Sequence, residues 1–216
     1  MRNKQSKKGI IFDMDNTLLR SHINFQAMKQ EIVSYLTEKD MLPKSFCMQE
    51  HTTSTVIQFA KERGLSEHMF YEVMGIAARH ELAGMEGAGL EPFVQPLLET
   101  LMGRYVLVIV TNNAYAAAQH VLELTEIAGY FDRVIGREQM EAMKPSPSGY
   151  LAAKKHFPHI QDREWISIGD SWIDGMASME AGIPFISYGG EEEWMEKKGV
   201  KVVAHIDNIL DLLDYL

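Results

Sequence analysis

Short, uninterrupted apolar runs recur along the chain, and polar residues follow most of them. The runs are GIIF at Gly9–Phe12, YVLVIV at Tyr105–Val110, RVI at Arg133–Ile135, WISI at Trp165–Ile168 and PFISY at Pro184–Tyr188. None alternates cleanly between apolar and polar residues, which is typical of strands covered on both faces of a parallel sheet. A weaker run, KVVAHI, lies near the end of the chain. The pattern predicts a buried parallel sheet.

Helical patterns separate the later runs. AYAAAQHVLELTEIAG is rich in helix formers and stops at Gly129, SWIDGMASMEAG stops at Gly182, and SPSGYLAAKKHF follows Lys144. Glycine commonly ends helices. A last helix is expected in DNILDLLDYL. Strands that alternate with helices are joined by right-handed crossovers, so we expect an α/β fold with a Rossmann-like, doubly wound parallel sheet.

The alternation is interrupted between Ser21 and about Glu86, where no strand is predicted. FQAMKQEIVSYL, TVIQFAKERG and EHMFYEVMGIAARHEL all have helical patterns, and the glycines and proline of EGAGLEP mark a return hinge. We therefore expect residues 1–20 and 87–216 to form the Rossmann-like core and residues 21–86 to form an inserted all-α cap domain. The alternative is that these helices thicken a single domain.

Composition and charge narrow the class of protein. The chain has 216 residues, of which 46% are hydrophobic and 24% charged, as in ordinary globular proteins. A net charge of −9 argues against nucleic acid as a partner. The single cysteine, Cys47, excludes an internal disulfide and a cysteine metal cluster, and it fits a reducing cytosol. No apolar segment approaches the length of a membrane span. We expect a cytoplasmic protein without a membrane partner.

Polar residues that could bind a ligand or take part in catalysis follow the predicted strands. They are Asp13 and Asp15 after the first, Thr111, Asn112 and Asn113 after the second, Lys144 beyond the third, and Asp170 and Asp174 after the fourth. Ligands of open parallel sheets bind outside the carboxyl ends of the strands. Because these ends share one edge of the sheet, several carboxylates should meet in a small volume.

Such a group of carboxylates needs compensating positive charge. Two like charges 4 Å apart repel by ~1 kcal/mol in water and by ~4 kcal/mol at an effective dielectric constant near 20. Lys144 supplies one positive charge. A hard divalent cation is the natural source of more, since all the candidate ligands are oxygens, and Mg²⁺ fits best because it binds few carboxylates and keeps waters.

These residues resemble the four motifs of the haloacid dehalogenase superfamily of phosphotransferases. DMDNTLL matches the first motif, DxDx[TV], and GDSWID matches the fourth, GDxxxD; Thr111-Asn112 and Lys144 match the second and third. The inserted helices resemble the helical cap of the branch that includes phosphoglycolate phosphatase and β-phosphoglucomutase. Asn16 stands where glycine is frequent, and asparagine tolerates the same left-handed backbone. Arg20 stands where aspartate is frequent.

The resemblance implies catalytic and phosphate-binding roles. Asp13 would be the nucleophile that forms an aspartyl-phosphate, and Asp15 the general acid and base. The Thr111 hydroxyl and the Asn112 backbone N–H would hold phosphoryl oxygens, while Lys144 would offset negative charge.

It also implies a metal site and a substrate region. Mg²⁺ would be bound by Asp13, Asp170 and the main-chain carbonyl of Asp15, with Asp174 as a further ligand or as a support for Lys144 and the metal. Arg20 and His22 are candidates for the substrate site at the cap hinge, although a surface role is an equal alternative.

The expected function is hydrolysis of a small-molecule phosphate monoester by a Mg²⁺-dependent phosphatase through an aspartyl-phosphate intermediate. Asp15 favours phosphate esters or anhydrides over other substrates of the family, because dehalogenases usually lack this second aspartate and phosphonatases replace it. The alternatives are a phosphomutase of the β-phosphoglucomutase type and a catalytically silent protein that binds a phosphorylated metabolite. The leaving group, the oligomeric state and the pathway are left open.

Overall fold

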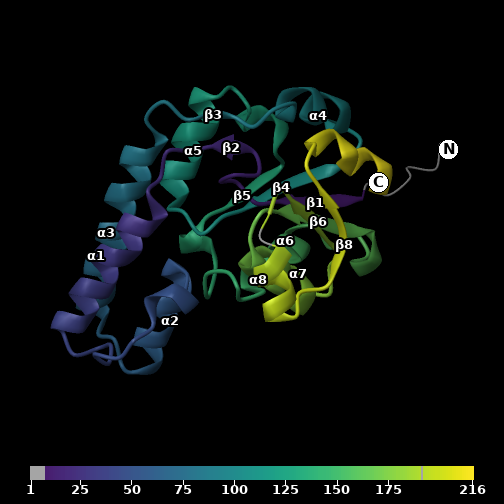
Figure 1. The fold of residues 1–216 in the computed structure, drawn as a ribbon. Coiled ribbons are helices and arrows are strands. Elements are labelled where there is room, and N and C mark those ends of the chain that lie inside the picture. Colours follow the sequence, from purple (N-terminus) through teal and green to yellow (C-terminus); the bar gives the residue numbers. More distant parts are fainter. Residues whose placement is uncertain (1–7, 191) are drawn as a thin grey trace. The chain divides into compact units, whose positions relative to one another are not determined.

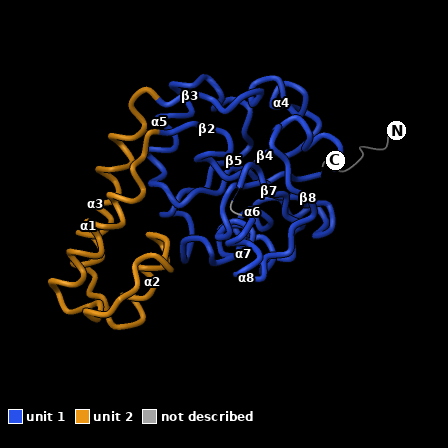
Figure 2. Tube along the Cα trace, in the orientation of Figure 1, with its two compact units in different colours: residues 1–21, 88–216 blue, residues 22–87 orange. Residues whose placement is uncertain are grey.

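The computed structural model describes residues 8–190 and 192–216, and the chain divides into two compact units (Figure 2). One unit contains the chain before residue 22 and after residue 87, and the other contains residues 22–87. The sequence predicted a division at nearly the same places, before residue 21 and after residue 86. The role of the second unit as a cap stays a prediction.

A six-stranded parallel sheet forms the centre of the first unit (Figure 1). The strands are β1 Gly9–Phe12, β4 Val106–Val110, β5 Arg133–Ile135, β6 Trp165–Gly169, β7 Phe185–Tyr188 and β8 Val202–Ile206. Their order is β5-β4-β1-β6-β7-β8, and each neighbouring pair is parallel. All six strands were predicted from the apolar runs, and the predicted α/β fold with a doubly wound parallel sheet is confirmed.

The strand order places the chain's change of direction beside β1. From β1 the chain moves outward through β4 to β5, and it then returns to β6 on the other side of β1 before it continues to β7 and β8. Such a switch point leaves a crevice at the carboxyl ends of the two strands where the chain diverges. In this unit those strands are β1 and β6, so the residues that follow Phe12 and Gly169 lie at the switch point.

Helices connect the strands of this sheet and flank it. They are α4 Val94–Leu101, α5 Tyr115–Leu124, α6 Ser148–His156, α7 Trp172–Glu180 and α8 Glu192–Lys198. The predicted last helix is instead a 3₁₀ helix, η5, at Ile209–Tyr215, whose first turn is capped by the side chain of Asn208. Over seven residues the apolar spacing of this segment fits either helix type.

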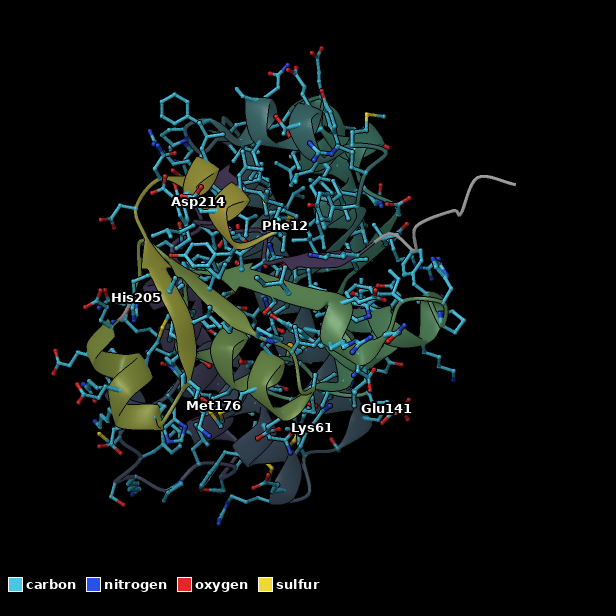
Figure 3. The ribbon with its side chains drawn as sticks, turned by 90° about the vertical axis from the view of Figure 1, so that its right-hand side faces the viewer. Phe12, Lys61, Glu141, Met176, His205 and Asp214 are labelled. Carbon is cyan, nitrogen blue, oxygen red and sulfur yellow. The ribbon has the colours of Figure 1, made fainter. Side chains whose placement is uncertain are left out.

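The interior of the first unit is apolar. Ile10, Ile11 and Phe12 of β1 are completely buried, as are the central residues of β4. Figure 3 shows Phe12 in the interior of the unit, His205 on the edge strand β8 and Asp214 on η5.

A two-stranded antiparallel ribbon joins the chain segments that lead to and from the second unit. It consists of β2 Leu19–Arg20 and β3 Gly89–Leu90. The backbone N–H of Glu91 also donates to the carbonyl of Leu18. The two connections therefore run side by side, directly after the loop that carries Asp13 and Asp15.

The second unit consists of helices α1 Phe25–Glu38, α2 Thr53–Glu62 and α3 Glu67–Met85, with a short 3₁₀ turn, η1, at Met48–Glu50. The side chains of Asn24, Thr52 and Ser66 cap the three helices. Helix α1 packs against both α2 and α3 and buries Met28, Ile32 and Leu36. Within the described residues of the whole chain, no helix has the length and apolar character needed to span a bilayer.

Gly9 tests how tightly β1 packs against its neighbours. A Cβ atom at this position would overlap the indole ring of Trp165, which is itself buried. We expect Gly9→Ala to lower the free energy of unfolding by roughly 1–3 kcal/mol, the usual cost of overpacking a core. Gly89→Ala is the matched control, because nothing lies within 4 Å of a Cβ at that position. Urea denaturation measures both variants, and equal stability of the two would contradict the packing described here.

Candidate functional site

The candidate site lies at the carboxyl ends of β1, β4 and β6. Asp13 and Asp15 follow β1, Thr111 to Asn113 follow β4, and Asp170 follows β6. Lys144 comes from the loop before α6, and Asp174 from the first turn of α7.

Lys144 is the buried cation of the site. Its side chain is 2% exposed, and its ammonium Nζ lies 2.5 Å from Asp13 Oδ1 and 2.6 Å from Asp174 Oδ1. It also donates to the carbonyl of Val110, at 2.9 Å. Burial alone would lower the pKa of Lys144, but the negative charges of Asp13 and Asp174 outweigh burial and raise it well above its usual value. Lys144 is therefore a permanent positive charge between two carboxylates.

Asp174 is held by the start of its own helix. Its Oδ2 accepts a hydrogen bond from the backbone N–H of Ser171 at 3.1 Å, the arrangement of a helix N-cap box. Burial and the charge of Asp13 raise the pKa of Asp174 to about 7, although Lys144 acts in the opposite direction. Asp174 is therefore held both by Lys144 and by the start of α7, and its role as a metal ligand or as a support stays a prediction.

Asp170 completes a group of three carboxylates. Asp13, Asp170 and Asp174 each offer one oxygen, and these oxygens all lie within 4.8 Å of one another. Burial, followed by the charges of Asp13 and Asp174, raises the pKa of Asp170 well above its usual value. Asn16 donates from Nδ2 to Asp170 Oδ2 at 3.2 Å. An all-oxygen set under mutual repulsion fits a small, hard divalent cation.

Asn16 also has the backbone conformation that the sequence predicted. Its φ is +56°, in the left-handed region, where asparagine is tolerated and glycine is most common. The prediction about this residue is confirmed, and the hydrogen bond to Asp170 adds a contact that glycine could not make.

Asp15 has a different environment from Asp13, two residues before it. Its Oδ2 accepts a hydrogen bond from Asn113 Nδ2 at 2.6 Å, whereas its Oδ1 is buried without a hydrogen-bond partner among the described residues. Burial and the charge of Asp13 raise the pKa of Asp15 to about 7. The nearby Ser21 hydroxyl and the Asn113 amide favour the charged form and lower the pKa of Asp15, although Ser21 Oγ forms no hydrogen bond with the described residues. The carboxyl group of Asp15 is thus not part of the three-carboxylate group.

Thr111 and Asn112 are both held within the site. The Thr111 hydroxyl is buried and accepts a hydrogen bond from the backbone N–H of Asn113 at 3.1 Å. The side-chain amide of Asn112 makes two hydrogen bonds to the backbone of Lys144, donating to its carbonyl at 3.1 Å and accepting from its N–H at 2.8 Å. Asn112 therefore fixes the loop that presents Lys144, a contact that the sequence did not predict.

The contacts that the structure gives for Arg20 and His22 do not involve the carboxylates of the site. The Arg20 guanidinium pairs with Glu91 at 3.4 Å and is 63% exposed. His22 is exposed and belongs to the second unit, where its backbone N–H donates to the carbonyl of Gly84. Their predicted contact with substrate stays a prediction.

Two residues of the site were given no role in the sequence analysis. Asn113 binds Asp15, and the Thr17 hydroxyl donates to Asp13 Oδ2 at 3.4 Å. Thr17 lies inside the first motif, DMDNTLL, and Asn113 directly follows the second, Thr111-Asn112. Their position after a predicted strand was the available signal.

Comparison with known proteins gives consistent matches. The family model described as haloacid dehalogenase-like hydrolase matches residues 10–188. A phosphoglycolate phosphatase of Rhodobacter capsulatus is 28% identical over 191 residues, which cover 83% of each chain. The phosphoglycolate phosphatase of Escherichia coli K12 is 33% identical over 102 residues, which cover 47% of this chain and 40% of the relative.

Solved structures match the fold over nearly the whole chain. A haloacid dehalogenase-superfamily hydrolase of subfamily IA from Geobacter sulfurreducens has a TM-score of 0.64 at 22% identity and covers 100% of this chain and 99% of its own. A hydrolase from Pseudomonas syringae has a TM-score of 0.73 at 19% identity, with 97% of each chain covered. At these identities the structural matches show a shared fold.

Lys144 offers a test of the electrostatics of the site. We expect Lys144→Met to lower the free energy of unfolding by about 3–5 kcal/mol at pH 8 without added metal, because Asp13 and Asp174 lose their buried partner. The loss should be smaller at pH 5, since the raised pKa of about 7 leaves Asp174 mainly protonated there and in less need of a cation. Urea denaturation at both pH values measures the effect.

Lys154→Met is the matched control for this substitution. Lys154 pairs with Asp162 at 2.9 Å, but Asp162 is 82% exposed. An ion pair with an exposed partner contributes about 0–1 kcal/mol, with little change over this pH range. A Lys144 variant that loses no more stability than the Lys154 variant, or loses as much at pH 5 as at pH 8, would show that Lys144 does not compensate the buried carboxylates.

Proposed function

The chain belongs to the haloacid dehalogenase-like hydrolases, and from this we propose that it is a Mg²⁺-dependent phosphatase that hydrolyses a small-molecule phosphate monoester through phosphorylated Asp13. The observation that carries the proposal is the contrast between its two neighbouring aspartates. Asp13 faces the buried ammonium of Lys144, whereas Asp15 faces the neutral amide of Asn113. Carboxyl groups in such different environments can serve as nucleophile and as acid–base group, respectively.

In the first step, an oxygen of the Asp13 carboxylate attacks phosphorus, and the bond between phosphorus and the ester oxygen breaks. Asp15 donates its proton to the departing oxygen, so that the leaving group departs as an alcohol. The pKa of about 7 keeps a substantial fraction of Asp15 protonated at neutral pH, as this step requires.

In the second step, Asp15, now ionised, takes a proton from a water molecule whose oxygen attacks phosphorus. The bond between phosphorus and Asp13 breaks, and inorganic phosphate leaves with Asp13 restored as a carboxylate. Asp15 ends the cycle protonated. Throughout, Lys144 offsets negative charge on Asp13 and on the transferred group.

Asp13, Asp170 and Asp174 would hold the Mg²⁺ ion, and the main-chain carbonyl of Asp15 stays a predicted further ligand. When bound, the ion supplies positive charge that offsets the carboxylates and the phosphoryl oxygens. Asp174 has a second task, because it also holds Lys144.

Phosphate-binding groups and the substrate region complete the proposal. The Thr111 hydroxyl and the Asn112 backbone N–H hold phosphoryl oxygens at the end of β4. The helical unit, residues 22–87, acts as the cap that selects the leaving group, with Arg20 and His22 beside its connections. The named relatives are phosphoglycolate phosphatases, which supports a small, anionic phosphate ester as substrate.

Substitution of the two aspartates tests the proposed roles. We expect Asp13→Asn to reduce phosphate release from p-nitrophenyl phosphate and from phosphoglycolate to background, because the nucleophile is lost. Asp15→Asn should lower kcat for phosphoglycolate by roughly 10²–10⁴ while the protein still binds inorganic phosphate. Phosphate release and calorimetric titration with phosphate measure these effects. Full activity of Asp13→Asn would rule out the aspartyl-phosphate route.

Mg²⁺ should stabilise the protein in a manner that depends on pH. The pKa values of Asp170 and Asp174 are raised in the folded protein, so protonation of these two groups stabilises the metal-free folded state. This stabilisation is fully present below pH 3.8, the ordinary pKa of an aspartate. For Asp174 it is lost as the pH rises through about 7. Since ligation requires ionised carboxylates, we expect Mg²⁺ to raise Tm more at pH 8 than at pH 5.5. Thermal unfolding with Mg²⁺ or with a chelator measures this, and Asp170→Asn should abolish the rise.

A further inference from the structure

Asn113 is assigned no task in the two reaction steps above, yet its side chain and backbone are both hydrogen-bonded within the site. It is 4% exposed and follows β4 by three residues. Its backbone N–H donates to the Thr111 hydroxyl at 3.1 Å, and its carbonyl accepts from the backbone N–H of Arg137 at 3.0 Å. The backbone is therefore fixed on both sides of the side chain, and the amide has a defined direction.

That direction is toward Asp15. Asn113 Nδ2 lies 2.6 Å from Asp15 Oδ2, a short buried contact between groups that are 98 residues apart in the chain. Asp15 Oδ1 has no hydrogen-bond partner among the described residues although it is buried. Buried polar atoms are nearly always paired, so an unpaired carboxyl oxygen at a sheet edge indicates a ligand that completes it.

We propose that Asn113 is a positioning residue that holds the Asp15 carboxyl group by Oδ2, so that Oδ1 is the atom that exchanges the proton with the leaving oxygen and with water. This inference rests on the proposed phosphatase function. An N–H that donates to Oδ2 occupies the oxygen that would otherwise compete for the proton. It also stops the carboxyl group from rotating, and orientation of the reacting groups is a major part of catalysis.

The neighbouring residue, Asn112, has a different role, so the contact with Asp15 is particular to Asn113. The amide of Asn112 is committed to the backbone of Lys144 through two hydrogen bonds. Consecutive residues after β4 thus hold different groups: Asn112 holds the loop of the cation, and Asn113 holds the acid–base carboxyl.

The leaving group offers a sharp test. Release of p-nitrophenolate needs little help from an acid, whereas release of an alkoxide requires a proton. For a phosphorylated-enzyme mechanism, kcat/KM reports only the steps up to release of the leaving group. We expect Asn113→Ala and Asn113→Leu to change kcat/KM for p-nitrophenyl phosphate by less than about threefold. The value for an alkyl phosphate should fall by about tenfold or more, a part of the 10²–10⁴ that an acid contributes.

The probe is whichever of phosphoglycolate, glycerol 3-phosphate and fructose 6-phosphate the wild-type protein hydrolyses fastest. Asn113→Leu keeps the volume of the side chain and removes its amide, so the test survives if the alanine variant fails to fold. Ser178→Ala is the matched control, because Ser178 is fully buried and its hydroxyl pairs with Ser167 at 2.6 Å. It removes a buried hydrogen bond elsewhere in the unit and should leave the ratio of the two kcat/KM values unchanged.

The outcomes separate the two proposals. A selective loss with the alkyl phosphate supports the positioning role of Asn113. Equal losses with both substrates, or a Ser178 variant that shows the same selectivity, would overturn the positioning role and leave the phosphatase function intact. A folded wild-type protein that hydrolyses neither class of ester would overturn the proposed function, and the inference about Asn113 with it.

Discussion

The site depends on one buried cation, the ammonium of Lys144 between Asp13 and Asp174. Each carboxylate is nearly inaccessible to water, and an unpaired charge in such a place costs several kcal/mol. Lys144 comes from a loop, but Asn112 at the end of β4 binds the backbone of that loop twice. The end of β4 therefore fixes the position of the Lys144 ammonium, and Asp13 and Asp174 both pair with it.

Most of the fold could be predicted because each buried strand is a short apolar run and each strand end is polar. Asp13, Lys144, Asp170 and Asp174 meet as expected, since parallel strands bring their carboxyl ends to one edge. The position of the switch between β1 and β6 was not predictable in the same way, because an apolar run carries no information about strand order. The few apolar residues of the last segment fit both helical periods, so the sequence did not distinguish its 3₁₀ helix from an α-helix.

The partners of individual side chains were beyond the reach of the sequence. Asn113 and Asp15 are 98 residues apart, Asn112 and Lys144 are 32 apart, and Arg20 and Glu91 are 71 apart. A motif shows that a polar residue follows a strand, but the contact it makes depends on strand order, on register and on the path of a distant loop. Arg20 illustrates this limit, since nothing in the sequence near Arg20 pointed to its pairing with Glu91.

The two aspartates of the first motif show why such contacts matter for chemistry. The proposed nucleophile, Asp13, lies against a buried cation, since Lys144 Nζ is 2.5 Å from its Oδ1. An acid–base group must lose a proton and regain one in each cycle. A permanent cation beside it would stabilise the ionised form and oppose the step in which it regains the proton. The amide of Asn113 carries no charge and can donate to Oδ2 in either state of Asp15. A spacing of two residues thus separates the roles only because the structure gives one carboxyl group a cation and the other a neutral donor.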